Sequence, residues 1–418
     1  MENASKHERR LLWLLAGIQL TVLLDFMVLM PLGPQLIGEL GLSAAQFGGL
    51  VSCYTLASAL FGVSGLFWLH RLERRRTLLV LYGGFALATL ACAAAGGALG
   101  LLVARVVAGA CAGLLWAVVM DVLVEVVPEE RRGAAMGVVM SAYAVSAVAG
   151  VPLGLWLAGW WGFRAPFWLL TFASIGLWLL AHRWLPASAA PRASEAAPAP
   201  AAHLFRAPEL WGGWALTFLV VSAGFLMIPY LGAFFVGTLE VRSEQLGLVY
   251  LCGGAATFFS SRLVGAAVDR FGPARVLAAL LVASAAPHLL VTQLERARLV
   301  EVVASFVLFM TLTSGRMIPT MVLLTSRVAP ELRARYLAVN TAVSDGASGT
   351  AAWLGGALLT TTPSGRLLGF DRIGQLAVAV SAAALFVLGL LARSTKLGNS
   401  AVLVAGRPEA SLSEGGSL

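Results

Sequence analysis

The stretch Gly265-Ala-Ala-Val-Asp-Arg-Phe-Gly-Pro-Ala-Arg-Val-Leu-Ala-Ala-Leu280 places a short charged turn between two long apolar blocks. A related stretch, His70-Arg-Leu-Glu-Arg-Arg-Arg-Thr-Leu-Leu-Val-Leu81, lies 199 residues earlier when His70 is matched to Asp269. Two further pairs lie at offsets of 199 to 202 residues: DFMVLMPLG from Asp25 opposite GFLMIPYLG from Gly224, and PEERRGAAMG from Pro128 opposite PELRARYLAV from Pro330. Three matches in register predict two similar halves.

The composition indicates a membrane protein, because 59% of the residues are hydrophobic, only 12% are charged, and the mean hydropathy is +0.85. Soluble domains carry about 25% charged residues. A membrane-spanning helix needs about 20 mostly apolar residues. Twelve such blocks are present, at 11–33, 47–69, 77–96, 98–120, 134–157, 164–186, 209–236, 244–268, 274–293, 299–325, 335–360 and 371–393. We therefore predict an all-α integral membrane protein with twelve transmembrane helices in two pseudo-symmetric six-helix bundles.

The polar segments divide the chain. Residues 1–186 form the predicted N-terminal bundle and residues 209–393 the C-terminal bundle. Between them, 187–208 is rich in Ala, Pro and Ser and is predicted to be a cytoplasmic linker. The Gly/Ser-rich end, 394–418, is predicted to be a disordered cytoplasmic tail.

The positions of the basic residues give an orientation. Of 29 Lys and Arg residues, 21 lie on the N-terminal side and in the even-numbered loops, six lie in the odd-numbered loops, and two lie inside helices. Cytoplasmic loops carry the excess of Lys and Arg, so both termini are predicted to be cytoplasmic. Six helices separate the members of each repeated pair, which makes the repeat parallel, one architecture of secondary transporters. The Arg-heavy, Lys-poor usage is typical of a GC-rich bacterial genome, and we predict that the protein lies in the bacterial plasma (inner) membrane.

Four ionisable residues lie within predicted membrane helices: Asp25, Arg105, Arg316 and Asp345. Such residues are rare and indicate function by default. They could neutralise one another across a central cavity, with Asp25 or Asp345 taking up a proton because burial disfavours a carboxylate. The two arginines could tune these acids or hold an anionic substrate group. The alternative is a static charge network that fixes helix packing.

Aromatic residues could line the same cavity, although such residues more often serve packing or lipid contact: Phe26, Tyr54, Tyr143, Phe225, Tyr230 and Trp353. The sequence contains no catalytic constellation. Its five histidines have no metal-ligand spacing, its four cysteines lie in apolar blocks, and a phosphate-binding Gly-Lys-Ser/Thr loop is absent. We therefore expect no enzyme activity, no metal, no cofactor and no nucleic-acid partner.

These motifs resemble the major facilitator superfamily, and within it the drug/proton antiporter and arabinose-efflux permease branch, over about residues 11–393. The stretch from Gly265 to Arg275 resembles the family's cytoplasmic loop signature. Arg105-Val-Val-Ala-Gly109-Ala-Cys-Ala-Gly113 is similar to the fourth-helix signature. Asp25-Phe-Met-Val-Leu-Met-Pro31-Leu-Gly-Pro34 is similar to the first helix. Gly150-Val-Pro152-Leu-Gly154, followed by Gly162-Phe-Arg164-Ala-Pro-Phe167, resembles the fifth-helix signature of exporters, where a bend works against the opposing half.

The resemblance implies a cytoplasmic gate whose contacts form in one conformation and break in the other. Its residues would be His70, Arg71, Glu73, Arg74, Arg75 and Glu125 in the N-terminal half, and Gly265, Asp269, Arg270, Gly272 and Arg275 in the C-terminal half. His70 stands where the family has Asp, and Glu73 stands where it has Gly. The C-terminal loop therefore matches the pattern more fully. The alternative is that these arginines only anchor the loops.

The function that the resemblance implies is secondary active transport by alternating access, as proton-coupled efflux of drug-like compounds, sugars or metabolites. The proton gradient would be the driving force. The expected partners are the lipid bilayer, a small-molecule substrate and protons, with the chain as a monomer. One alternative is an importer or uniporter of a small metabolite on the same fold. Another, from a different class, is a membrane-embedded receptor or enzyme.

Overall fold

The computed structural model describes residues 6–185, 208–294, 297–328, 330–362 and 365–405. The first half contains α1 (Lys6–Leu29), α2 (Gly33–Leu40), α3 (Ala44–Trp68), η1 (Leu69–Arg71), α4 (Arg74–Ala94), α5 (Ala98–Val126), η2 (Glu129–Arg131), α6 (Arg132–Val145), the π-helical turn η3 (Ser146–Gly150), α7 (Val151–Trp161) and α8 (Arg164–Trp184).

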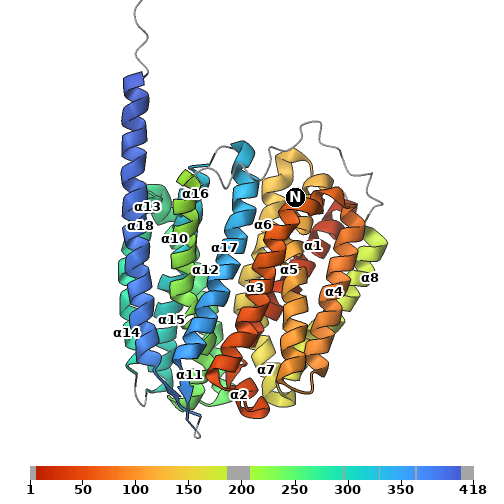
Figure 1. Cartoon of the computed structure of the whole chain (residues 1–418). Coiled ribbons are helices and arrows are strands. Elements are labelled where there is room, and N and C mark those ends of the chain that lie inside the picture. Colours follow the sequence, from red (N-terminus) through yellow and green to blue (C-terminus); the bar gives the residue numbers. More distant parts are fainter. Residues whose placement is uncertain (1–5, 186–207, 295–296, 329, 363–364, 406–418) are drawn as a thin grey trace, which may run out of the picture.

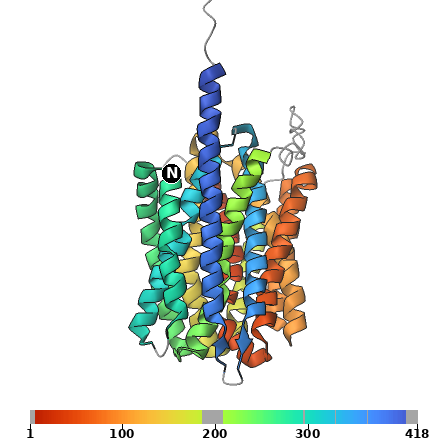
Figure 2. The same ribbon diagram turned by 60° about the vertical axis from the view of Figure 1, so that its left-hand side comes forward.

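The second half contains α10 (Pro208–Phe225), η4 (Ile228–Tyr230), α11 (Leu231–Gly237), α12 (Ser243–Phe271), α13 (Pro273–Ala283), α14 (Ala285–Thr292), α15 (Leu299–Gly315), α16 (Met317–Thr325), α17 (Pro330–Leu358), the antiparallel strands β1 (Thr360–Thr361) and β2 (Leu367–Leu368), and α18 (Phe370–Ala405). Figure 1 shows the two halves side by side, and Figure 2 shows the same arrangement turned by 60°. The predicted all-helical membrane fold is confirmed.

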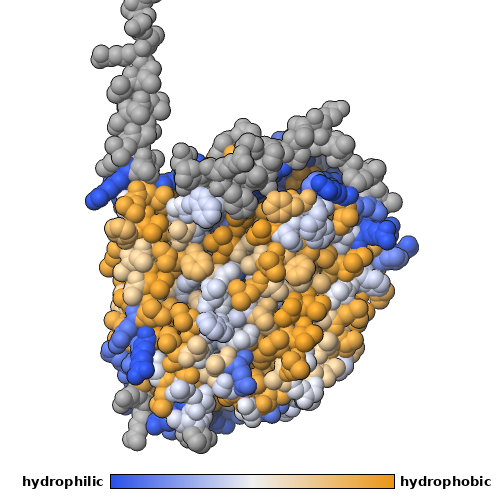
Figure 3. Space-filling model, viewed as in Figure 1, coloured by the Kyte–Doolittle hydropathy of each residue, from blue (hydrophilic) through white to orange (hydrophobic). Residues whose placement is uncertain are grey.

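Two faces of the molecule are distinguished by what they carry. The face with the N-terminal start of α1, the start of α10 and the end of α18 is here called the terminal face; the face with α2 and the β-hairpin is the opposite face (Figure 1). On the side of the molecule that Figure 3 shows, an apolar band lies between them, and hydrophilic residues gather towards the two ends. This distribution is what a bilayer requires of the surface that it contacts.

Eleven helical spans in the described part of the chain are long and apolar enough to cross a membrane. The twelfth predicted block, 335–360, corresponds to α17, which has 29 residues and reaches from one face to the other. It is more polar than the other spans because it carries Asn340, Ser344, Asp345, Ser348 and Thr350. These residues are tolerated because α17 lies against α3 of the other half, so much of its surface faces protein rather than lipid.

Three helices that the sequence predicted as continuous are broken, and each break has the same cause. A proline ring clashes with the carbonyl group four residues earlier, and its nitrogen cannot donate a hydrogen bond to that group. Each helix segment ends four residues before a proline: α10 at Phe225 before Pro229, α13 at Ala283 before Pro287, and α15 at Gly315 before Pro319. The three breaks lie in the C-terminal half, where they expose polar backbone within the membrane region.

The predicted end of the first span needs correction, whereas the predicted end of the last span is confirmed. The first span was predicted to reach residue 33, but α1 ends at Leu29, because Pro31 follows and α2 begins separately. The last span ends at Arg393, as predicted, although its helix, α18, continues to Ala405. Extending an existing helix requires no new nucleation, so polar residues such as Lys396 do not stop it. The tail beyond 405 and the linker up to 207 lie outside the described residues.

The two halves are tightly joined near the opposite face. The Tyr230 hydroxyl of η4 donates a hydrogen bond to the carbonyl oxygen of Ala352 in α17. A Cβ on Gly48 of α3 would meet that hydroxyl, and would lie 2.9 Å from the Ala352 oxygen and 3.3 Å from Gly356 Cα. Only glycine fits at position 48, because any side chain would separate α3 from α17.

Towards the terminal face, the seam between α6 and α12 opens. A Cβ on Gly254 of α12 would lie 2.5 Å from the carbonyl oxygen of Ala147, so the helices touch there. Nearer the terminal face, Cβ atoms on Gly137 of α6 or Gly265 of α12 would meet no described atom within 4 Å. The structure is therefore closed at the opposite face, and this seam is open at the terminal face.

We expect Gly113→Ala to destabilise the N-terminal half, because its Cβ would clash with the backbone oxygen of Ser58 in α3. A backbone oxygen cannot rotate away as the end of a side chain can, so α3 and α5 must separate. This separation should lower the free energy of unfolding by about 1–3 kcal/mol. The matched control is Gly137→Ala in α6, which has open space around the new methyl group. Thermal unfolding of purified protein in detergent should show a lower Tm for the first variant only; equal Tm values would contradict the packing argument.

Candidate functional site

A buried ion pair joins the first and fourth membrane spans. Arg105 Nη1 of α5 lies 2.6 Å from Asp25 Oδ2 of α1 and 3.2 Å from the Asp25 carbonyl oxygen. Both residues are fully buried. The other carboxylate oxygen, Asp25 Oδ1, has no hydrogen-bond partner among the described residues. The pair neutralises both charges inside the membrane, and it leaves one carboxylate oxygen that can receive a proton.

A row of three aromatic rings leads from this pair into the other half. The Arg105 guanidinium lies 4.1 Å from the centroid of the Tyr54 ring, a cation–π contact. Tyr54 stacks on Phe26 with centroids 5.5 Å apart, and Phe26 stacks on Phe225 of α10 at 6.1 Å. Phe26 and Phe225 are half-buried. The row is the apolar part of the site and is contributed by both halves.

A second carboxylate, Asp345 of α17, bonds across the seam. Ser58 Oγ of α3 donates a hydrogen bond to Asp345 Oδ2 at 2.5 Å, and Ser52 Oγ donates to the carbonyl oxygen of Gly349 at 2.7 Å. Neither serine was among the residues predicted from the sequence. Ser52, Thr55 and Ser58 recur at every third position of α3, and this polar stripe was the available signal.

Arg316 lies at the break between α15 and α16 and is fully buried. Its Nη1 donates to Ser381 Oγ at 3.1 Å and to Ser284 Oγ at 3.4 Å, and its Nε donates to the Thr313 carbonyl oxygen at 3.2 Å. Among the described residues it forms no ion pair. The four charges therefore do not neutralise one another across a cavity as expected: only Asp25 and Arg105 pair, because the side chain of Arg316 points into its own half.

The predicted gate residues of the N-terminal loop lie at the terminal face. Arg74 Nη1 is 3.2 Å from Glu125 Oε2 of α5, and Arg75 Nη2 donates to the His182 carbonyl oxygen of α8 at 2.9 Å. His70 and Arg71 are exposed in η1, and Glu73 immediately precedes α4. The expected Arg–Glu pair is present, and it ties α4 to α5 within one half.

The C-terminal loop is arranged differently. Gly272 joins α12 to α13 with a φ of 83°, a conformation that favours glycine. Asp269, Arg270 and Arg275 are exposed, and the Arg270 guanidinium lies 5.2 Å from the Phe271 ring centroid. These three residues form no ion pair with a described side chain. The charged residues of the loop that matches the family pattern more fully therefore form no ion pairs with described residues in this conformation. The seam between α6 and α12 is open beside this loop, at Gly265.

The fifth-helix motif contains a π-helical turn, 146–150, just before Pro152. Gly150 and Gly154 pack against the first helix of the same half: Cβ atoms there would lie 2.7 Å from Leu24 Cδ1 and 2.5 Å from Val28 Cγ2. The Pro152 carbonyl oxygen faces the opposing half, 3.9 Å from a Cβ on Gly247 of α12. The glycines therefore serve close packing within the half.

Two of the aromatic residues that were predicted to line the cavity are exposed and not buried. Trp353 is 58% exposed and Tyr143 is 49% exposed, whereas Tyr54 is 4% exposed. Trp and Tyr in membrane helices are suited to lipid contact as well as to cavities, and the sequence cannot separate the two roles.

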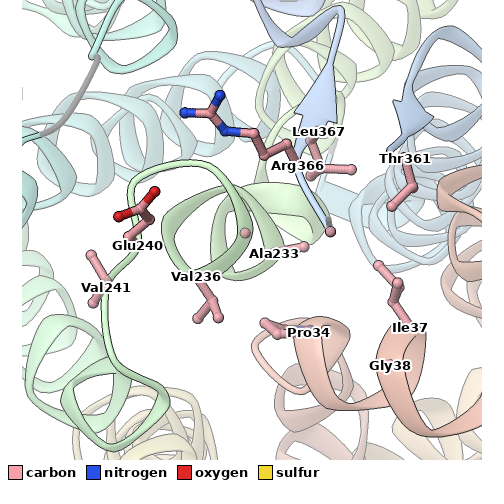
Figure 4. A pocket seen from close by; sticks show the side chains of 12 residues that line it. Pro34, Ile37, Gly38, Ala233, Val236, Glu240, Val241, Thr361, Arg366 and Leu367 are labelled. Carbon is pink, nitrogen blue, oxygen red and sulfur yellow. The ribbon is translucent and has the colours of Figure 1, made fainter. Parts of the chain in front are cut away.

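A pocket of about 680 Å³ opens at the opposite face, away from the ion pair (Figure 4). Glu240, whose φ is 58°, and Arg366 are its charged residues. Short elements that close this face build the pocket: Pro34, Ile37 and Gly38 of α2; Ala233, Val236, Gly237, Glu240 and Val241 of α11 and the loop after it; and Thr361, Gly365, Arg366 and Leu367 of the β-hairpin.

The family model of the Major Facilitator Superfamily matches residues 15–352. The chain belongs to the major facilitator superfamily. It is therefore a multi-pass membrane protein of the major facilitator type, and the family resemblance inferred from the motifs is confirmed. The superfamily consists of transporters rather than enzymes, which disfavours the receptor or enzyme alternative.

Curated relatives include efflux proteins. A "Probable sugar efflux transporter" of Pasteurella multocida (strain Pm70) is 25% identical over 231 residues, covering 54% of this chain and 57% of that protein. A "Chloramphenicol resistance protein" of Streptomyces lividans is 30% identical over 252 residues, covering 59% of this chain and 63% of that protein. The chain thus spans about three fifths of each of these relatives.

Solved structures show the same fold. A bacterial homolog of the human lysosomal transporter Spinster superposes with a TM-score of 0.71 at 16% identity, covering 94% of this chain and 98% of that one. A D-xylose–proton symporter gives a TM-score of 0.69 at 15% identity, covering 92% and 97%.

We expect Tyr54→Leu to lower stability by about 1–2 kcal/mol, since it removes the ring that faces the Arg105 guanidinium. Tyr54→Phe keeps that ring, and the Tyr54 hydroxyl has no hydrogen-bond partner in the described part of the chain, so its stability should stay within about 0.5 kcal/mol of the wild type. Thermal unfolding of both purified variants tests this. Equal losses in the two variants would assign the effect to the hydroxyl.

Proposed function

We propose that this transporter exports small molecules from the bacterial cytoplasm in exchange for protons, without a cofactor. The observation that carries the proposal is the fully buried Asp25–Arg105 pair with its unpartnered Oδ1 atom. The names of the sugar-efflux and chloramphenicol-resistance relatives support the direction and the substrate class. The cluster of basic residues at the termini and even-numbered loops supports a cytoplasmic terminal face.

In the proposed cycle, a proton binds Asp25 Oδ1 and neutralises the carboxylate. Arg105 then loses the partner that offsets its charge in the membrane, and an unpaired buried charge is strongly destabilising. The Tyr54 ring lies on that guanidinium, so a shift of Arg105 displaces the aromatic row that reaches Phe225 in the other half. Protonation is thereby linked to the contact between the halves, which is what exchange by alternating access requires.

The Ser58–Asp345 bond offers a second link. It joins α3 to α17 directly, so protonation of Asp345 alters an interaction that holds the two halves together. In the proposed cycle the Arg74–Glu125 pair and the C-terminal loop residues Asp269 and Arg270 act at the terminal face as the gate, making and breaking contacts as the α6–α12 seam closes and opens.

We expect Asp25→Asn to abolish proton-coupled export while leaving the fold intact. Asparagine keeps an oxygen that can accept from Arg105 but cannot exchange a proton. In inverted membrane vesicles from an efflux-deficient host, chloramphenicol or arabinose should dissipate an imposed pH gradient with the wild type, and at least about tenfold more slowly with the variant.

The matched control is Asp371→Asn at the exposed start of α18, which should behave as the wild type. Unchanged proton movement in Asp25→Asn would overturn the assignment of this residue. Failure of the wild type to move protons with either compound would overturn proton-coupled export, and uptake into right-side-out vesicles would favour the importer alternative.

A further inference from the structure

The seam between α6 and α12 has two walls, which follow from the contacts where it is closed. A Cβ on Gly254 of α12 would lie 2.5 Å from the Ala147 oxygen and 3.3 Å from Val148 Cα, both in η3. An α-helix has about 3.6 residues per turn, so positions four, seven, eight or eleven residues away lie on the side that makes this contact. Towards the terminal face, the residues along the seam are therefore Gly137 and Met140 on one wall, and Phe258, Arg262 and Gly265 on the other.

These walls are mostly apolar, and they are accessible. Met140 and Phe258 are exposed, and Cβ atoms on Gly137 and Gly265 would meet no described atom within 4 Å. An opening of this kind inside a membrane is filled by hydrocarbon, because an empty gap loses dispersion contacts and apolar walls offer water no hydrogen bonds. The occupant that the bilayer supplies is the acyl chain of a lipid.

Arg262 places a cation on the α12 wall. Its side chain is exposed, and its guanidinium lies 4.8 Å from the centroid of the Phe258 ring. It forms no ion pair with a described carboxylate. The nearest acid along α12 towards the terminal face is Asp269, which is seven residues further on, or about 10 Å along the helix axis. Arg262 is therefore a charged donor in the seam whose charge no described ion pair offsets.

The depth of Arg262 suits a lipid headgroup. Arg262 precedes the end of α12 at Phe271 by nine residues, which is about 13 Å of helix. Long basic side chains at such a depth extend towards the membrane surface, where lipid phosphates lie. A phosphate on this guanidinium would leave its acyl chain deeper in the seam, because Phe258 lies one helical turn nearer to the contact at Gly254.

We propose that an anionic phospholipid binds in the open α6–α12 seam, with its phosphate on Arg262 and an acyl chain between Met140 and Phe258. A negative headgroup is favoured over a zwitterionic one, because the ammonium group of a zwitterion offsets its own phosphate and is repelled by the guanidinium. The inference goes beyond export: it assigns a lipid site between the halves, and it depends on neither the direction of transport nor proton coupling.

The test titrates the full chain, purified in detergent, with phosphatidylglycerol or phosphatidylcholine of identical acyl chains, and native mass spectrometry measures the first bound lipid. The wild type should bind phosphatidylglycerol about fivefold more tightly. Arg262→Gln should reduce this preference to less than about twofold, and Arg262→Lys should keep part of it because the charge remains. The matched control, Arg183→Gln, removes an exposed arginine at the end of α8, on the same face, and should bind as the wild type.

Gly137→Leu provides a second variant that leaves Arg262 in place. Its side chain would enter the open seam, so the affinity for phosphatidylglycerol should fall at least about threefold, because two groups cannot share one volume. The matched Gly389→Leu in α18 also has open space around it and should bind as the wild type. Thermal unfolding of each variant verifies that it is folded.

Equal binding of the two lipids by the wild type overturns the inference, and so does a folded Arg262→Gln that keeps the wild-type preference. A folded Gly137→Leu that binds phosphatidylglycerol as tightly as the wild type would overturn the site by placing the lipid outside the seam. Displacement of phosphatidylglycerol by glycerol phosphate at similar concentrations would assign Arg262 to a soluble anion instead. No pH gradient is used, so the result is separable from the success or failure of proton-coupled export.

Discussion

The rest of the structure depends on how charge is held inside the membrane. An isolated charged side chain in hydrocarbon is costly, so a buried charge needs a partner in the protein or in a ligand. The N-terminal half meets this requirement with the 2.6 Å pair of Asp25 and Arg105. The C-terminal half surrounds Arg316 with hydroxyl groups and supplies no described carboxylate. The two repeated halves have therefore diverged in electrostatics while sharing one fold.

Proline positions explain why the C-terminal half can hold such a charge. Three membrane spans of this half are interrupted before Pro229, Pro287 and Pro319, and Arg316 lies at the last of these breaks. Each break leaves backbone carbonyl groups without their helical donors, and Arg316 uses the Thr313 oxygen near its own break. The last break thus lies beside one acceptor of the buried cation, whose Nη1 atom donates to two serine hydroxyls.

Close helix contact connects these sites to the relative position of the halves. Gly48 lets α3 approach α17 near the opposite face, and Ser58 and Asp345 form a polar contact within the same seam. The aromatic row crosses between the halves at Phe26 and Phe225. In the proposed cycle, a change at the Asp25–Arg105 pair reaches the interface through these rings and helices, and the relative movement of the two halves gives alternating access.

Much of the fold followed from local patterns, since the length of the apolar blocks and the 199-residue repeat predict membrane-spanning helices in two halves. Asp25 and Arg105 were recognisable in the sequence because charged residues in apolar blocks are rare. The tertiary structure decided which charges meet. Helix order does not state which faces of distant helices touch, so neither the Ser58–Asp345 bond nor the isolation of Arg316 was predictable. The tertiary structure also separated Tyr54, 4% exposed, from Trp353, 58% exposed, because buried and exposed aromatic residues of membrane helices look alike in the sequence until helix packing is known.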